Sequence, residues 1–368
     1  MIVLNNSNSY FASGLYKCFQ AALLREGIDS YFFVPVNTKW AGSTADHRVK
    51  ASLCFRNMDR YFYRYKQKKI YNEFETTIRE IRPDILHAHF LFSSGFSCLR
   101  AKQKFGLKYI VAVRNTDVNA FFRYCFWLRK LGIEIMEESS AIIFLNEPYR
   151  CYVIDKYVPQ RLKKAIDEKS IVIPNGIDQF WLNNSKQHQH PEGKTIRIVY
   201  AGGIDRNKNC VATVKACEQL IQKGYEIKYT LIGKIIDKTC FDKISGRSFI
   251  EYIPHMNKEE LAKLYKEQDI FVMPSINETF GLVYAEAMSQ GLPVIYSRGQ
   301  GFDKQFEEGQ VGYSVDSCNP EEIADKIEAV LEQYDEISAR CTVLCRKFDW
   351  NEIVKQYISI YQRALDEQ

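Results

Sequence analysis

Two carboxylates, Glu278 and Glu286, stand eight residues apart within residues 270–295, IFVMPSINETFGLVYAEAMSQGLPVI. The segment is predicted to form a strand to about residue 273 and a helix over about 279–290, because a glycine and a proline follow that stretch. Along a helix, eight residues correspond to a rise of about 12 Å. The two carboxylates are therefore expected to contact different parts of one extended ligand rather than to share a proton.

The start of this predicted helix is a candidate anion site. Backbone amides of a first helical turn have no partner within the helix, and such a terminus suits a phosphate or a pyrophosphate. Here the amides belong to Thr279, Phe280, Gly281 and Leu282, and Gly281 permits close approach of a ligand to the backbone. The alternative is a capped helix in which Glu278 complements the helix dipole and Glu286 is simply exposed.

The elements that must position these groups follow a regular order. Short apolar runs alternate with longer amphipathic stretches, which is typical of β-α-β units and parallel sheets. Strands are expected at 2–4, 31–36, 85–89, 109–113, 141–145, 171–173, 196–201, 229–232, 249–252, 270–273 and 293–296. The predicted fold class is therefore α/β, with two Rossmann-like doubly wound domains that face each other across a cleft.

The domain boundaries are predicted from composition. A polar segment at 181–195 is expected to link an N-terminal domain at 1–180 to a C-terminal domain at 196–350, and 351–368 has the apolar spacing of a helix. Open α/β sheets bind ligands at the carboxyl ends of their strands, so the loops after strands are the candidate sites.

Several short motifs, taken in order, resemble those of one enzyme family. The run from Glu278 to Glu286, followed by Gly291-Leu292-Pro293, resembles the E-x7-E motif of retaining glycosyltransferases. The segments PDILHAH (83–89), IPNGID (173–178) and FVMPS (271–275) resemble an N-terminal strand, an interdomain turn and the strand before the acidic motif. Together they cover nearly the whole chain, which resembles glycosyltransferase family 4 with its two-domain GT-B fold.

The resemblance implies a nucleotide-sugar donor bound mainly by the C-terminal domain, a UDP-sugar on family base rates with GDP-mannose second. Glu286 would accept hydrogen bonds from the ribose hydroxyls, and Glu278 would contact the sugar ring near the reacting carbon. The amides from Thr279 to Leu282 would hold the pyrophosphate, and Gly301 would add a further backbone donor. In the family the C-terminal helix returns to the N-terminal domain.

Positive charge for the leaving diphosphate is expected in residues 200–209, YAGGIDRNKN. Lys208 matches the family's lysine, whereas Gly203, expected in the donor site, stands where the family has an arginine. Arg206 is predicted to substitute for that arginine, and the alternative is a pair of exposed loop cations. Because such charges stabilise a phosphate without a metal and no Asp-x-Asp occurs, neither a metal nor a cofactor is expected.

The N-terminal half departs further from the family. Gly14 matches its glycine-bearing donor loop only in part, and Arg114, Asn115 and Asp117 occupy the place of a His-Gly-x-Asp motif that contacts the sugar. An arginine accepts no proton at neutral pH, which suits a retaining, front-face transfer without a general base. His89, at a strand end, is a candidate acceptor contact, and its neighbour His87 is expected in the core.

Residues 56–71, RNMDRYFYRYKQKKIY, interleave six Lys/Arg with five aromatic residues and one acid. This pattern suits the surface of an anionic membrane or an anionic acceptor. The alternative is an amphipathic helix with its aromatic rings packed inward. Single-stranded nucleic acid also fits such a pattern, but nothing else in the chain supports it and no nucleic acid partner is expected.

Composition sets the broad class. The 368 residues, 46% of them hydrophobic, predict a folded chain of two or three domains, and 1–170 carries 27 Lys/Arg against 16 Asp/Glu, which favours an anionic partner. Eleven cysteines without a Cys-x-x-Cys predict reduced thiols. With no signal peptide and no apolar run near about 20 residues, the chain is expected in the cytoplasm, peripherally on the inner face of a membrane.

These features predict a retaining hexosyltransferase that moves a sugar from a nucleotide sugar to a saccharide or lipid-linked saccharide, in surface polysaccharide or glycolipid synthesis. Two alternatives stay open. One is a nucleotide-sugar 2-epimerase, which shares the architecture and needs no acceptor. The other is a non-catalytic nucleotide-sugar-binding subunit, which the departures at Gly203 and Arg114 would suit.

Overall fold

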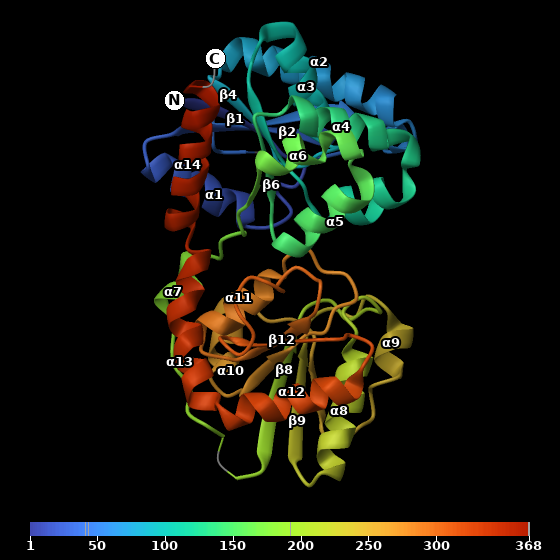
Figure 1. The fold of residues 1–368 in the computed structure, drawn as a ribbon, viewed down its shortest axis with the longest axis vertical. Coiled ribbons are helices and arrows are strands. Elements are labelled where there is room, and N and C mark those ends of the chain that lie inside the picture. Colours follow the sequence, from blue (N-terminus) through green and yellow to red (C-terminus); the bar gives the residue numbers. More distant parts are fainter. Residues whose placement is uncertain (41, 43, 192, 367–368) are drawn as a thin grey trace. The chain divides into compact units, whose positions relative to one another are not determined.

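The computed structural model describes residues 1–40, 42, 44–191 and 193–366 (Figure 1). The chain divides into two compact units. The first contains Met1–Leu145, Arg150–Pro174 and Trp350–Gln368, and the second contains Asn146–Tyr149 and Asn175–Asp349.

Among its described residues, the first unit has one sheet of seven parallel strands in the order β3-β2-β1-β4-β5-β6-β7. The strands are β1 (Ile2–Asn6), β2 (Asp29–Asn37), β3 (Val49–Phe55), β4 (Ile85–Ala88), β5 (Tyr109–Ala112), β6 (Ala141–Phe144) and β7 (Ser170–Val172). The central strands β4, β5 and β6 are buried along their whole length, as expected when helices cover both faces of a parallel sheet. The strand β3 was not predicted.

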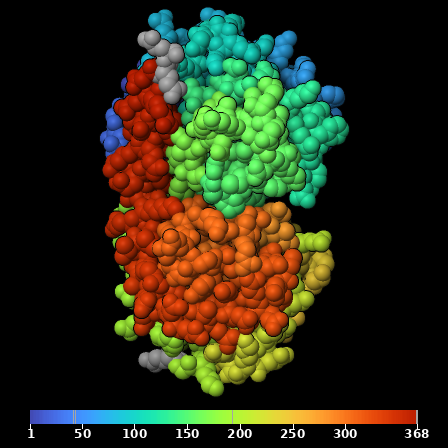
Figure 2. Space-filling view, in the orientation of Figure 1, coloured from blue at the N-terminus to red at the C-terminus, as the bar shows by residue number. Residues whose placement is uncertain are grey.

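Helices cover this sheet. They are α1 (Leu15–Arg25), α2 (Tyr63–Ile81), α3 (Gly95–Phe105), α4 (Arg129–Glu138), α5 (Glu147–Tyr157) and α6 (Gln160–Glu168), with short turns η1 (Asn57–Tyr61), η2 (Asp117–Phe122) and η3 (Phe126–Leu128). The C-terminal helix α14 (Trp350–Asp366) packs here as well, because its apolar stripe meets α1: the rings of Trp350 and Tyr357 lie 5.5 and 5.2 Å from that of Phe19. In Figure 2 this red segment forms part of the same surface as the N-terminal half of the chain.

The described part of the second unit has a sheet of six parallel strands in the order β10-β9-β8-β11-β12-β13. They are β8 (Thr195–Ala201), β9 (Glu226–Ile232), β10 (Ile250–Ile253), β11 (Ile270–Val272), β12 (Val294–Ser297) and the unpredicted β13 (Gly312–Val315). The helices are α7 (Gln179–Asn183), α8 (Cys210–Gln222), α9 (Lys238–Asp242), α10 (Lys258–Tyr265), α11 (Leu282–Ser289), α12 (Pro320–Glu332), α13 (Tyr334–Leu344) and η4 (Cys345–Phe348).

The strand order reverses its direction between β8 and β11. From β8 the chain proceeds to β9 on one side, and the later strands begin at β11 on the other. Such a switch point separates the loops at the carboxyl ends of the two strands and leaves room for a ligand between them. The loops after β8 and β11 are the ones that carry the predicted cations and Glu278.

The boundary between the units differs from the prediction, because the first residues beyond Pro174 are part of the second unit. Ile177 and Trp181 are 2% and 3% exposed, Ile177 pairs with Asp349, and the Gln290 side chain donates to the Trp181 carbonyl at 3.0 Å. Burial of these two apolar side chains holds α7 against α11. From the sequence alone, residues up to 180 were assigned to the preceding domain.

Candidate functional site

The loops after β8 and β11 meet at the switch point of the second unit. The Asn207 side chain donates to the Asn277 carbonyl at 2.9 Å and accepts from the Asn277 amide at 3.0 Å. Next to this junction the Lys208 Nζ lies 2.5 Å from the Glu278 Oε2. Two predicted catalytic residues that are seventy positions apart in sequence therefore form an ion pair.

Glu278 is held from several directions. Its Oε1 accepts from the amides of Thr279 and Phe280 at 3.1 and 3.5 Å, and its own amide donates to the Gln300 Oε1 at 2.9 Å. The side chain is 12% exposed, so the carboxylate is oriented by fixed donors and still reaches the surface. A preorganised carboxylate of this kind can accept hydrogen bonds from ligand hydroxyls.

Two glycines are required by this geometry. Gly281 has a φ of 74°, and a Cβ there would lie 2.5 Å from the ring of the buried Tyr284. A Cβ on Gly301 would lie 2.2 Å from the Phe280 nitrogen. Both positions therefore exclude larger residues. At Gly281 the left-handed backbone and the Tyr284 ring are the reason, and at Gly301 the loop after β12 lies directly on the segment that precedes α11.

The expected role of Gly301 is corrected by the structure. Its amide donates to the Glu278 carbonyl at 2.6 Å, so this donor is already used within the protein. Gly301 thus supports Glu278 rather than offering a free amide to a pyrophosphate.

The helix after Glu278 also begins later than predicted, at Leu282 instead of about residue 279. Thr279 and Phe280 are 8% and 3% exposed, and their amides face the Glu278 carboxylate, so the prediction that they are open donors for a phosphate is wrong in this conformation. Gly281 and Leu282 keep part of their surface exposed at the start of α11. The accessible part of the predicted anion site is therefore this shorter segment.

Glu286 lies further along α11 and is only partly exposed. Burial, and secondly the nearby Asp178, raise the pKa of this carboxyl group to about 7. Asp178 itself caps α7 and pairs with Lys258 at 2.6 Å. Glu286 is therefore poised to change its charge near neutral pH, and a ligand that needs the anion must supply hydrogen bonds to stabilise it.

Arg206 and Lys208 are not brought together as a cationic pair. Arg206 is exposed and lines a cavity of about 530 Å³ with Asp205, Asp237 and Lys243, whereas Lys208 faces Glu278. The backbone conformation of Gly203 does not itself require glycine. A Cβ at this position would nevertheless lie 2.4 Å from the terminal methyl of Ile236. The side chain of Ile236 thus occupies space next to the position where the family has an arginine.

In the first unit, Asp117 is a structural residue rather than a ligand contact. It is fully buried, and its oxygens accept from the amides of Leu91, Phe92 and Arg114 at 3.0, 3.0 and 2.9 Å. Burial raises the pKa of this carboxyl to about 6 against the opposing effect of these amides. The prediction that Asp117 contacts sugar or acceptor is wrong, because both oxygens are engaged in joining two loops.

His89 is also corrected. It is 2% exposed, its Nε2 lies 2.9 Å from the Asn5 Oδ1, and its ring stacks on His87 at 3.8 Å. Burial holds the pKa of both histidines well below the usual range. His89 therefore belongs to the core with His87, whose Nδ1 lies 2.8 Å from the Tyr361 hydroxyl on α14.

Arg114 lies between these buried groups and the surface. It is 8% exposed, and its Nε donates to the His89 carbonyl at 3.4 Å. Asn115 is exposed beside it and accepts from the Asn119 side chain at 2.8 Å. Gly14 is exposed at the start of α1, with a φ of −68° and open space where a Cβ would stand, so its local conformation does not require glycine.

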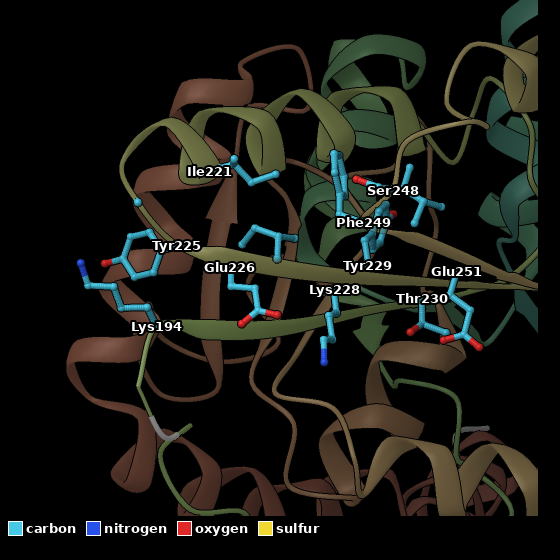
Figure 3. Close-up of a pocket in the computed structure, with 13 residues that line it drawn as sticks. Lys194, Ile221, Tyr225, Glu226, Lys228, Tyr229, Thr230, Ser248, Phe249 and Glu251 are labelled. Atoms are coloured by element: carbon cyan, nitrogen blue, oxygen red, sulfur yellow. The ribbon is translucent and has the colours of Figure 1, made fainter.

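A larger pocket of about 720 Å³ lies elsewhere on the second unit (Figure 3). Most of its residues come from β9, the start of β10 and the segments just before these strands, with Lys194 just before β8, and Lys228, Thr230 and Glu251 extend from the same side of the strands. Ligands of open α/β sheets bind at the opposite, carboxyl ends, so this pocket is no part of the candidate site.

The described residues contain no group of three or more His, Cys, Asp or Glu side chains placed to hold a metal ion. Nor does any helix among them combine the length and the apolar character that a membrane span requires.

Comparisons with known proteins match both halves of the chain. The model for glycosyl transferases group 1 matches residues 182–343, and that for glycosyltransferase family 4 matches 20–179. A D-inositol 3-phosphate glycosyltransferase of Nocardioides is 32% identical over 48% of the chain and 43% of its own length. An uncharacterised glycosyltransferase of Methanocaldococcus jannaschii is 24% identical over 77% of the chain and 76% of its own length.

Solved structures share the fold over the whole length. Sucrose-phosphate synthase of Thermosynechococcus elongatus superposes with a TM-score of 0.78 at 16% identity and covers 100% of both chains. HepE of Anabaena, solved with UDP and glucose, gives 0.71 at 15% identity over 97% of this chain and 98% of its own. Both share with this chain the fold predicted from the sequence, two parallel sheets with flanking helices.

Proposed function

Because the chain belongs to the family 4 glycosyltransferases with the GT-B fold, we propose that it transfers a hexosyl group from a UDP-sugar to a saccharide or lipid-linked saccharide. UDP is favoured as the nucleotide because relatives of the same fold were solved with UDP, with UDP-glucose and with UDP-2-fluoro glucose. A starch synthase of this fold was solved with ADP instead, so the nucleotide itself is part of the test.

The observation that carries the proposal is the Lys208–Glu278 ion pair at the switch point of the second sheet. Glu278 is oriented by two amides and can accept from the hydroxyls of the donor sugar. Lys208 can exchange its partner for the diphosphate, since an ammonium group donates in several directions. As the bond to the diphosphate breaks, this lysine would stabilise the negative charge that develops on the departing oxygen.

The nucleoside would lie along α11. The accessible start of that helix, at Gly281 and Leu282, suits the diphosphate, and the partly buried Glu286 suits the ribose hydroxyls. Binding a diol to the ionised form of Glu286 would lower its pKa from about 7, because the hydrogen bonds favour the anion.

We propose that the anomeric configuration is retained. The reason is that none of the predicted sugar or acceptor contacts in the first unit can act as a general base. Arg114 accepts no proton, the oxygens of Asp117 are engaged, and His89 is enclosed in the core. The acceptor oxygen would therefore attack the anomeric carbon from the side of the leaving group. The bond from that carbon to the phosphate oxygen breaks, and the same oxygen takes the proton of the acceptor hydroxyl.

We further propose that the reaction needs neither a metal nor a cofactor, because the protein supplies its own cation to the diphosphate at Lys208. Activity in the presence of a chelator would support this part of the proposal, and loss of activity that added Mg²⁺ restores would overturn it.

The product class follows from the acceptor. Curated and structural relatives include glycosyltransferases that act on inositol phosphate, an enzyme of sucrose phosphate synthesis and a galactosyltransferase of the lipopolysaccharide outer core. For this chain we propose a surface polysaccharide or glycolipid, with peripheral attachment to a membrane that holds a lipid-linked acceptor.

The test is an assay of UDP release from a panel of UDP-, GDP- and ADP-sugars with oligosaccharide and lipid-linked acceptors, with the anomeric configuration of the product read by NMR. Acceptor-dependent UDP release and a new glycosidic bond of retained configuration are expected. An epimerised donor without a glycoside would identify an isomerase. Nucleotide binding without turnover of any pair would identify a binding subunit.

A further inference from the structure

Two segments of the first unit expose large apolar side chains although they lie far apart in sequence. In η1 and at the start of α2, Met58, Tyr61, Phe62 and Tyr65 are 68%, 73%, 65% and 55% exposed. In the second segment the exposed side chains are Tyr124, Phe126 and Trp127, at 64%, 69% and 63%. Groups of exposed aromatic residues of this size commonly mark an interaction surface.

The fold joins these segments. The rings of Tyr63 and Phe121 lie 6.0 Å apart, and Phe121 stacks on Phe92 at 4.8 Å. The Tyr63 hydroxyl donates to the Phe92 carbonyl at 2.7 Å. The contacts among Tyr63, Phe121 and Phe92 therefore hold the two segments together, and the exposed rings belong to these joined segments.

The same segments are strongly basic. Lys and Arg occur at nine positions within 56–69 and 123–130: Arg56, Arg60, Arg64, Lys66, Lys68, Lys69, Arg123, Arg129 and Lys130. The single acid of these segments, Asp59, is buried and pairs with Lys69 at 2.7 Å. We call residues 56–69 and 123–130 the aromatic–basic surface, and its exposed charge is positive.

Folding of the domain does not account for the exposed rings. The inner face of α2 already packs Ile70, Phe74 and Ile78 into the core. The rings of Tyr61, Phe62 and Tyr65 point away from that face, so the alternative of an amphipathic helix with all its aromatic residues inward is wrong for these three. Some of the cations lie directly on rings, as Lys66 does at 4.0 Å from Phe55 and Arg123 at 5.3 Å from Tyr124.

We infer that the aromatic–basic surface binds the face of a lipid bilayer that contains anionic lipids. Tyr and Trp side chains prefer the headgroup level of a membrane, and Lys and Arg are attracted by anionic headgroups. Met58, Phe62 and Phe126 carry no hydrogen-bonding group and fit the boundary with the acyl chains. Charge complementarity thus selects the anionic bilayer as the occupant.

This inference rests on the proposed function in one respect: a lipid-linked saccharide acceptor would be presented at the membrane that the aromatic–basic surface binds. Binding to vesicles can be measured without any sugar transfer. A wild-type protein that binds vesicles but transfers no sugar would refute the proposed function alone, and a wild-type protein that transfers sugar to soluble acceptors but binds no vesicles would refute the membrane surface alone.

The test is co-sedimentation of the full chain with vesicles of phosphatidylcholine, alone or with about one third phosphatidylglycerol, at two salt concentrations. One variant combines Phe126→Ser with Trp127→Ser, and a second combines Arg60→Gln, Arg64→Gln and Lys68→Gln. Matched controls are Val343→Ser, an exposed apolar residue of the second unit, and Lys164→Gln, an exposed cation on α6. Thermal unfolding verifies that each variant is folded.

The wild type and both controls are expected to bind the anionic vesicles, and binding to pure phosphatidylcholine should be much weaker. Each patch variant should bind at least about tenfold more weakly, and the charge variant, which removes three of the nine cations, should show a reduced salt dependence, since each cation near such a surface contributes about fivefold. Equal binding by patch and control variants would overturn the inference. So would absence of vesicle binding, combined with patch-dependent binding of a single-stranded oligonucleotide or patch-dependent dimerisation.

Discussion

The raised pKa of Glu286 leads to a quantitative prediction about nucleotide binding. With a pKa of about 7, the carboxyl is about 9% ionised at pH 6 and about 91% at pH 8. If only the ionised form binds the ribose, the dissociation constant of a UDP-sugar should fall about tenfold from pH 6 to pH 8. Binding at pH 7 should release close to half a proton as the hydrogen bonds lower the pKa.

The stability of the unliganded protein changes with pH in the opposite direction to nucleotide affinity. The folded-state pKa lies above the ordinary value of 4.5, so the unliganded native state holds its proton more tightly than the unfolded chain. The stability that this group contributes is greatest when it is protonated and is lost as the pH rises from about 4.5 to 7. The largest possible loss is about 3 kcal/mol, from about 1.4 kcal/mol per pKa unit. Glu286→Gln should therefore stabilise the unliganded protein at pH 8 while it weakens nucleotide binding.

Isothermal titration calorimetry at pH 6, 7 and 8, in buffers of different ionisation enthalpy, measures both affinity and proton release. A UDP-sugar is the appropriate ligand, because it lacks the terminal phosphate whose second pKa lies near 6. Glu251→Gln is the matched control, since Glu251 is an exposed carboxylate of the same unit at the opposite end of the sheet. A UDP-sugar affinity that stays constant from pH 6 to pH 8, or that Glu286→Gln leaves unchanged, would refute the ribose role.

The remaining predictions concern single side chains. Lys208→Ala should lower kcat/KM at least about a hundredfold in the UDP-release assay, whereas Arg206→Ala, which alters an exposed side chain on the cavity lined by Asp237 and Lys243, should cost less than about threefold; the reverse order would assign the leaving group to Arg206. Gly281→Ala should destabilise the protein by about 1–3 kcal/mol in chemical denaturation, and Gly14→Ala by less than about 0.5 kcal/mol, because only the first has a positive φ and a ring in the way; equal effects would contradict the geometry. Asp117→Ala should cost about 2–3 kcal/mol by leaving three buried amides without an acceptor, and an unchanged midpoint would show that the loop closes without it.

The acidic motif illustrates which candidate residues short sequence patterns can select. Glu278 and Glu286 are selected by the E-x7-E motif in which the chain resembles the family, and Lys208 by its match to the family's lysine in a loop after a strand. Their types and order are local features, so a single chain suffices to select them. The helix start was placed three residues too early, because Gly281 adopts the left-handed conformation that only the fold reveals.

Errors occurred where a partner distant in sequence decides the role of a group. Gly301 looked like a free amide, but the Glu278 carbonyl accepts its hydrogen bond. Asp117 and His89 looked like ligand contacts at strand ends, but the amides of Leu91 and Phe92 and the side chain of Asn5 engage them within the fold. Nothing in a local window reports such competition for hydrogen bonds.

The sequence by itself determined the two α/β domains, the family and the candidate acidic and basic residues, because alternation of apolar runs and short motifs are properties of neighbouring positions. Only the tertiary structure decided that Lys208 pairs with Glu278 while Arg206 lines a cavity with Asp237 and Lys243, and that the ring of Tyr63 contacts that of Phe121. The physical reason is that burial and pairing depend on which loops the sheet order brings together. Strand order is set by packing across the whole domain, which no single segment encodes.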